Sequence, residues 1–165
     1  MLSYKLLFFL PLISTIFTYP FGVLLGEKTA QYFSSTLISI AAILSWFLFI
    51  SFSSSSSSEI IIPVLEWFFV SGQFFNWGIS VNSLTLLMLT LVLTVSALVH
   101  IYSIEYMSHD NSKVRFMTYL SLFTFCMVAL VVSDNLIQLF FGWEGVGLAS
   151  YLLIGFWHHK KSANL

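Results

Sequence analysis

Residues 83–103 read SLTLLMLTLVLTVSALVHIYS, and this stretch decides the fold class. It contains no Asp, Glu, Lys or Arg, and it has about the 20 residues that an α-helix needs to cross the hydrocarbon core of a bilayer. The whole chain of 165 residues is similar, with 58% hydrophobic, 18% aromatic and only 8% charged residues. Soluble domains contain about 25% charged residues, so most of this chain is predicted to lie in a membrane.

Four further apolar stretches predict spanning helices, which makes the fold class an all-α membrane protein with about five transmembrane helices. They cover about residues 6–25, 33–52, 115–132 and 135–157. The first contains Pro11 and Pro20, which membrane helices tolerate when their neighbours satisfy the freed carbonyls. A secretory signal is the alternative for this stretch, although it is long for one and lacks a small-residue cleavage pattern. Asp134 or Asn135 is placed to cap the fifth helix.

A linker and a surface β-hairpin are predicted between the second and third helices. Ser53–Ser58 is a homopolymeric run and reads as a flexible spacer. Residues 59–82 are apolar but too broken to span a membrane, and they place aromatic and β-branched residues around the turn-like Ser71-Gly72-Gln73. We therefore expect two short strands at the membrane surface, with Trp67 and Trp77 at headgroup depth. A re-entrant segment is the alternative.

The positions of the cations predict the orientation of the helices. With five spans, five of the six Lys and Arg residues fall on one side of the membrane: Lys28, Lys113, Arg115, Lys160 and Lys161. Only Lys5 is on the other side. Because cytoplasmic or matrix-facing loops carry an excess of cations, the C-terminus is predicted to face the cytoplasm or matrix, and the N-terminus and hairpin the outer side.

Several classes of function are excluded by what the sequence lacks. Six Lys and Arg against seven Asp and Glu offer no basic face for nucleic acid. The single cysteine, Cys126, cannot form an intramolecular disulfide, and the four histidines show no zinc-ligand spacing. No phosphate-binding glycine loop and no nucleophile with a base are present, so proton chemistry is what remains.

Glu144 is the candidate functional residue, because it falls near the centre of the fifth span. An ionisable group at that depth costs at least about 2.5 kcal/mol unless it is protonated, hydrated or paired. No lysine or arginine lies within the spans away from their ends, so a counter-charge has to come from another polypeptide. The alternative is a permanently neutral glutamic acid that serves helix packing.

The neighbours of Glu144 predict how the fifth helix packs. Gln138, Gly142, Gly145 and Ala149 recur at helical spacing about 100° around the helix from Glu144, and such small residues let another helix approach closely. Glu144 itself shares a second face with Gly147 and Tyr151, and the absent side chain of Gly147 leaves space beside the carboxyl group.

The third span offers His100 as a second candidate, with Ser96 and Ser103 on the same helix face. A histidine can pass protons near neutral pH, which makes His100 a possible proton relay. It lies near the inner end of its helix, however, so the alternative is a polar tip that reaches the interface. The charged residues Glu105, Asp110, Lys113 and Arg115 are predicted to form a solvated loop, and His158 to Lys161 an interfacial anchor.

Three segments resemble a known family. These are Tyr106-Met107-Ser108-His109-Asp110, then RFMTYLSLFTF over residues 115–125, then LFFGWEGVGLASYLLIGFW over residues 139–157. Together they resemble the N-terminal part of subunit 5 of NADH:ubiquinone oxidoreductase, respiratory complex I. This is an antiporter-like family related to Mrp-type sodium/proton antiporter subunits. The Gly-Trp-Glu-Gly-Val-Gly motif is the most specific part, and before residue 83 the resemblance rests on the helix and hairpin layout.

The resemblance implies a subunit of a proton-pumping NADH:ubiquinone reductase in which the motif glutamate, Glu144, pairs with a lysine on a later helix. Residues 1–52 are then two N-terminal transmembrane helices, 53–82 the linker and hairpin, and 83–165 the first three helices of the antiporter-like core, incomplete at the C-terminus. Because the chain stops at Leu165, we expect a companion chain carrying the rest of subunit 5 with that lysine. Asn82 departs from the aspartate expected there, and the six-serine run departs from the family pattern.

Further expectations follow from the resemblance. Partners would be subunit 4, other membrane-arm subunits and lipids, but no nucleic acid. This chain would hold no cofactor, and flavin mononucleotide (FMN) and iron–sulfur clusters would lie elsewhere in the complex. The high phenylalanine content suits the mitochondrial inner membrane, with a bacterial plasma membrane as the alternative. The alternatives for function are a structural assembly fragment of the membrane arm and an Mrp-type cation/proton antiporter subunit.

Overall fold

A computed structural model describes residues 1–53, 59–70 and 73–157, without the side chains of residues 67, 68, 70 and 73–75. In these residues five helices are long and apolar enough to cross a membrane, as predicted. They are α1 (Leu2–Leu25), α2 (Glu27–Ser53), α3 (Ser83–Tyr106), α4 (Lys113–Val131) and α5 (Leu136–Ile154), which continues into the short 3₁₀ turn η1 (Gly155–Trp157). The serine spacer 54–58, the turn 71–72 and residues 158–165 lie outside the described residues, as does the Trp67 side chain.

Local side chains explain where the helices begin. The Asn82 side chain accepts a hydrogen bond of 2.8 Å from the backbone N–H of Thr85 and so caps α3. Asn135, rather than Asp134, caps α5 by accepting a 2.9 Å bond from the backbone N–H of Gln138. Both bonds satisfy amides that have no partner within the first turn of a helix. Gly26, with φ of 96°, separates α1 from α2, a conformation that favours glycine.

The predicted hairpin is confirmed, and the re-entrant alternative is wrong. Strand β1 (Ile60–Val70) pairs antiparallel with β2 (Gln73–Val81), so that Ile60 lies opposite Val81 and Phe69 opposite Phe74. The strands are longer than expected. Pro63 has no backbone N–H to donate, and irregularities in the register after Pro63 and after Glu66 let the pairing continue beyond it.

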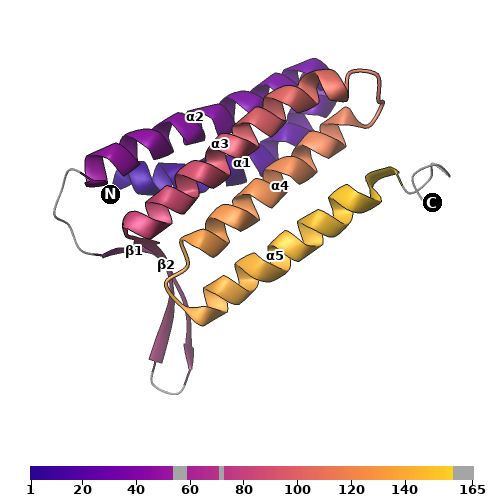
Figure 1. The fold of residues 1–165 in the computed structure, drawn as a ribbon. Coiled ribbons are helices and arrows are strands. Elements are labelled where there is room, and N and C mark those ends of the chain that lie inside the picture. The colour runs from indigo at the N-terminus through magenta and orange to yellow at the C-terminus, as the bar shows by residue number, and fades with distance from the viewer. Residues whose placement is uncertain (54–58, 71–72, 158–165) are drawn as a thin grey trace.

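The helices form a bundle with the hairpin at one end (Figure 1). Helix α1 packs against α2 and α4, α2 packs against α3, and α5 packs chiefly against α4 at the edge of the bundle. The N-terminus lies at the hairpin end, and the described chain finishes at the opposite end. Buried apolar side chains from α1 to α4 and from the hairpin form one core, which includes Leu7, Ile38, Ile79, Leu93 and Val128. Helix α1 is therefore an integral part of the bundle.

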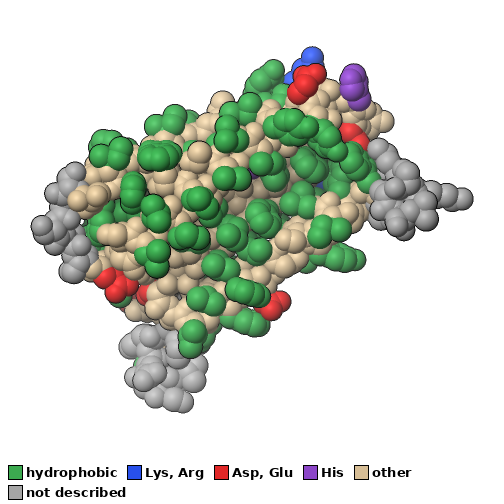
Figure 2. Space-filling model, viewed as in Figure 1, with side chains coloured by type: hydrophobic (Ala, Val, Ile, Leu, Met, Phe, Trp, Pro, Cys, Tyr) green, Lys and Arg blue, Asp and Glu red, His purple; other side chains and the backbone are tan. Residues whose placement is uncertain are grey.

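Apolar side chains also cover the outside of the bundle. Figure 2 shows them spread over the visible flank, with Lys, Arg and His side chains at the end away from the hairpin. Most of the exposed large side chains on α5 are apolar, including Phe140, Trp143, Leu148 and Ile154. Such a surface suits lipid or further transmembrane helices rather than water.

Candidate functional site

One face of α5 fits closely against α4, as the small-residue pattern predicted. Gln138 and Ala149 are 1% and 0% exposed, and Gly142 is buried as well. A Cβ atom added at Gly142 would lie 2.7 Å from the backbone nitrogen of Leu130, and one added at Gly145 would lie 2.7 Å from Sγ of Cys126. The two helices therefore approach closely because these glycines have no side chains.

Glu144 lies on the other face of α5, and its side chain is exposed. The residues beside it are open too, since Tyr151 is 74% exposed and a Cβ added at Gly147 would meet nothing within 4 Å. A groove of about 460 Å³ runs along this face between Glu144 and Gly147 on α5 and Met127 and Leu130 on α4. The predicted space beside the carboxyl group is therefore present.

The Glu144 carboxylate has no hydrogen bond and no ion pair within the described part of the chain. The ion pair that the described residues do form, Lys113 with Glu27 at 2.7 Å, lies at the end of the bundle. Glu144 is about two turns from the start of α5 and nearly three from its end. In a helix that crosses a membrane, this position near the middle is where an ionised group costs most. That it pairs with a lysine of another chain stays a prediction.

His100 is fully buried in the core, so the interpretation of its ring as a polar tip at the interface is wrong. Its Nδ1 atom lies 2.8 Å from the backbone carbonyl oxygen of Ser96, and its Nε2 atom lies 3.3 Å from Oγ of Ser121. His100 is buried because α2 and α4 pack over the face of α3 that carries it. Ser103, on the same face, is also buried.

A cluster of buried hydroxyl groups adjoins His100. Oγ of Ser14 on α1, of Ser34 on α2 and of Ser121 on α4 lie 2.8 to 3.1 Å from one another, and all three side chains are 0% exposed. Sequence reasoning missed this cluster. The signal available was a serine on each of three apolar helices, and nothing local indicated that the three would meet.

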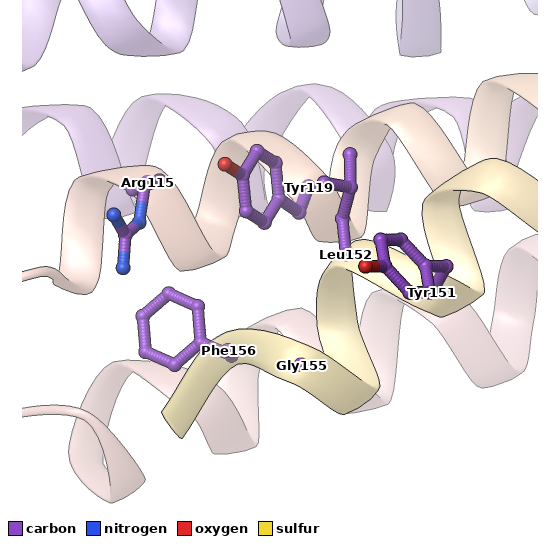
Figure 3. Close-up of a pocket in the computed structure, with 6 residues that line it drawn as sticks. All are labelled: Arg115, Tyr119, Tyr151, Leu152, Gly155 and Phe156. Atoms are coloured by element: carbon purple, nitrogen blue, oxygen red, sulfur yellow. The ribbon is translucent and has the colours of Figure 1, made fainter. Parts of the chain in front are cut away.

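The expected solvated loop at the opposite end from the hairpin is instead largely structured. Lys113 pairs with Glu27 and its side chain is only 14% exposed, and Asp110 accepts a 2.9 Å hydrogen bond from the Trp157 indole. The Arg115 guanidinium lies 5.0 Å from the centre of the Phe156 ring, at the mouth of an open pocket of about 340 Å³. Figure 3 shows this pocket, with Arg115 and Tyr119 contributed by α4, Tyr151 and Leu152 by α5, and Gly155 and Phe156 by η1.

The hairpin is fastened to the start of α5 by Gln138. The Gln138 side chain accepts a 3.2 Å hydrogen bond from the backbone N–H of Gly78 and donates a 2.9 Å bond to the Gly78 carbonyl. Trp77 packs edge-on against Phe141 at 5.1 Å between ring centres, and Ser80 donates a backbone bond to Val132. The sequence pattern had assigned Gln138 only to the ridge of small residues, so this contact was not predicted.

Comparison with protein families finds two matches. Residues 67–117 match the model described as NADH-ubiquinone oxidoreductase (complex I), chain 5 N-terminus. Residues 133–164 match the model described as NADH:quinone oxidoreductase/Mrp antiporter, TM. The second match contains the close-packed face of α5 and Glu144.

Individual proteins are similar over nearly the whole chain. NADH-quinone oxidoreductase subunit L of Rhodobacter capsulatus is 48% identical over 148 residues, which are 86% of this chain and 20% of that protein. NADH-ubiquinone oxidoreductase chain 5 of Chondrus crispus is 43% identical, and that of Arabidopsis thaliana is 44% identical, each over 98% of this chain and 24% of the relative. The chain therefore spans about a quarter of the length of the curated relatives it matches.

Proposed function

Since this chain belongs to the family of complex I chain 5, also called NADH-quinone oxidoreductase subunit L, we propose that it is the N-terminal, antiporter-like part of a proton-translocating membrane subunit. The assembly would couple NADH oxidation and quinone reduction to proton pumping. The observation that carries the proposal is Glu144, an acid at mid-helix depth beside an open groove and without a partner in the described residues.

Glu144 would carry the proton through a change of its charge partner. A lysine beside the carboxylate stabilises the ionised form by Coulomb attraction, and in a low-dielectric site this attraction is strong. Withdrawal of that lysine leaves the ionised form unstabilised, so the carboxylate takes up a proton. Return of the lysine reverses the balance and releases the proton. The groove beside Gly147 leaves room for the lysine or for water.

The partner of Glu144 would be a lysine of subunit 5 outside the residues of this sequence. Subunit 4, further membrane-arm subunits and lipids would contact the exposed apolar flank, and FMN and iron–sulfur clusters would be held by other subunits. Among the described residues, no group of three or more His, Cys, Asp or Glu is placed to hold a metal ion.

We place this multi-pass membrane protein in the mitochondrial inner membrane. The C-terminus would face the matrix, and the N-terminus and hairpin the intermembrane space. Relatives from Chondrus crispus and Arabidopsis thaliana named NADH-ubiquinone oxidoreductase chain 5 support the mitochondrial assignment. The orientation is inferred from the excess of cations in matrix-facing loops, because Lys113 and Arg115 lie at the end away from the hairpin.

Glu144→Gln tests the proposal, because it removes the ionisable group and keeps the shape of the side chain. NADH-driven proton uptake is measured in vesicles that contain the intact complex, and the amount of complex is measured on native gels. We expect proton uptake to fall while assembly stays normal. The matched control is Glu66→Gln, the same change at an exposed position in the hairpin, which is expected to have no effect. Normal proton uptake in Glu144→Gln refutes Glu144 as the proton carrier.

A second candidate is a structural assembly fragment, and the anchored hairpin favours it. Gln138 and Ser80 hold the hairpin against the ends of α4 and α5, which makes it a rigid surface for a neighbouring subunit. Under this function Glu144→Gln is silent and deletion of residues 59–82 prevents assembly. Co-purification with flavin and iron–sulfur proteins separates both candidates from an Mrp-type antiporter outside complex I.

A further inference from the structure

The geometry points to a second proton-carrying site, a buried relay of hydroxyl groups and the His100 imidazole among α1 to α4. This inference rests on the proposed proton translocation and adds residues to it. The relay consists of Ser14, Ser34, Ser121, His100, Ser96 and Thr124.

The hydrogen bonds of the relay follow one direction. A carbonyl oxygen can only accept, so the 2.8 Å contact with the Ser96 carbonyl places a hydrogen on Nδ1 of His100. In a neutral imidazole Nε2 is then an acceptor, and the Ser121 hydroxyl donates to it. Ser14 donates to Ser34 at 3.1 Å, so the Ser34 hydroxyl is free to donate to Ser121 at 2.8 Å. The chain therefore runs from Ser14 through Ser34 and Ser121 to the imidazole.

This order permits one proton to pass with all bonds balanced. Ser121 gives its hydroxyl hydrogen to Nε2 of His100 while its oxygen takes the hydrogen of Ser34. Ser34 takes the hydrogen of Ser14, which receives the incoming proton. The imidazolium that results can release its Nδ1 hydrogen to Oγ of Ser96, 3.3 Å away. Ser96 takes that hydrogen and gives its own to the Thr124 hydroxyl, 2.5 Å away. Thr124 then releases the hydrogen that it donates here to the Leu120 carbonyl, at 2.9 Å, to a water molecule in the groove that it lines. The ring is left with its hydrogen on Nε2, so a flip of the imidazole ring is needed, together with rotation of the hydroxyl groups, to restore the starting arrangement. Nothing is oxidised or reduced.

The entry end of the relay has an unsatisfied polar group. Gln31 lies one turn before Ser34 on α2, is 3% exposed, and its Nε2 atom is buried without a hydrogen-bond partner. Buried amide groups without a protein partner are commonly satisfied by water. Gln31 is also one turn from Glu27, which pairs with Lys113 at the end of the bundle. Water beside Gln31 would connect that end with the serine cluster.

The exit end of the relay lies at a groove that shares one lining residue with the groove of Glu144. Ser96 and Thr124 line a groove of about 320 Å³ formed by α3, α4 and Leu153 of α5, whose other lining residues are apolar. Met127 lines this groove and also the groove that contains Glu144. The relay therefore ends one side chain away from the groove of the acid that the proposed function requires.

Ser121→Ala tests the relay, because it removes the hydroxyl that joins the serine cluster to the imidazole. His100→Gln is the second variant, since an amide reaches the same neighbours but does not take up a proton. Ser45→Ala is the matched control: its hydroxyl is equally buried at 0% exposure but bonds at 2.7 Å to the Ala42 carbonyl of its own helix. Each change is made in the intact complex, and proton uptake is divided by the amount of assembled complex.

We expect proton uptake per assembled complex to fall by about tenfold or more in Ser121→Ala and His100→Gln, and to stay normal in Ser45→Ala. Less complex with normal uptake per complex means that the cluster only stabilises the bundle, and this result overturns the relay. Normal uptake with normal assembly overturns it too. If proton uptake is normal in Glu144→Gln but reduced in Ser121→Ala, the role of Glu144 is refuted and the relay stands. If proton uptake is reduced in Glu144→Gln but normal in Ser121→Ala, the relay is refuted and the role of Glu144 stands.

Discussion

Replacement of Gly142 by alanine is expected to loosen the contact between α4 and α5. The added Cβ would lie 2.7 Å from the Leu130 backbone nitrogen, about 0.7 Å short of the 3.4 Å at which ordinary contact begins. Backbone atoms cannot rotate away, so α5 has to move outward along this face. Such overpacking costs about 1–3 kcal/mol. Alanine also favours a helix over glycine by about 1 kcal/mol, which offsets part of this cost.

Gly147→Ala is the matched control, since the same substitution there meets nothing within 4 Å. The gain in helix propensity is common to both variants and cancels when they are compared. Only the clash with Leu130 remains, so Gly142→Ala is expected to be less stable than Gly147→Ala by about 1–3 kcal/mol.

Cys126 provides the assay, because it is the single cysteine of the chain and lies under Gly145 of α5. It is 5% exposed, so a small membrane-permeant maleimide reacts with it only when α5 separates from α4. At about 1.4 kcal/mol per factor of ten, Cys126 in Gly142→Ala is expected to react about 5- to 150-fold faster than in Gly147→Ala. The rate for the unfolded chains is the control. If Cys126 reacts with the maleimide equally fast in folded Gly142→Ala and Gly147→Ala, and equally fast in the two unfolded chains, close packing of α5 on α4 at Gly142 is refuted.

Two further substitutions test the contacts that position α5. Gln138→Leu leaves the Gly78 N–H and carbonyl without their partner, so we expect a loss of about 1–3 kcal/mol and faster hydrogen exchange at the Gly78 amide. Asn135→Ala removes the cap of α5 and is expected to cost about 1 kcal/mol. Loss of the cap is expected to speed hydrogen exchange at the Gln138 amide. Unchanged exchange at the Gly78 amide in Gln138→Leu, or at the Gln138 amide in Asn135→Ala, contradicts the hydrogen bond assigned to that amide.

The packing of α5 was predictable because helical periodicity is a local property. Residues 138, 142, 145 and 149 fall on one face whatever the rest of the chain does, and small side chains there predict close approach of a helix. The same count places Glu144 and Gly147 away from that face. The caps of α3 and α5 are also local features, since each depends on a side chain next to the helix start. Asn82 stands where the family pattern has an aspartate, and its side-chain oxygen still accepts the hydrogen bond that caps α3.

The surroundings of His100 were not predictable in this way. Its position near one end of α3 favoured the interface, and the structure places it in the core because α2 and α4 cover that face. Ser14, Ser34 and Ser121 lie far apart in the sequence, and each reads alone as an ordinary serine of a membrane helix. Their meeting depends on the rotation of three helices, which no local pattern specifies.

The amino-acid sequence by itself determined which segments enter the membrane, where α3 and α5 begin, and that Glu144 stands at mid-helix without a cation on its own helix. These features follow from hydrophobicity, capping and the 3.6-residue period, which act within one segment. Tertiary structure alone decided which helix covers which face, and with it the burial of His100, the serine cluster and the Gln138 contact with Gly78. Hydrogen bonds between helices form only once packing has brought the partners within reach, because each segment alone leaves those groups unpaired.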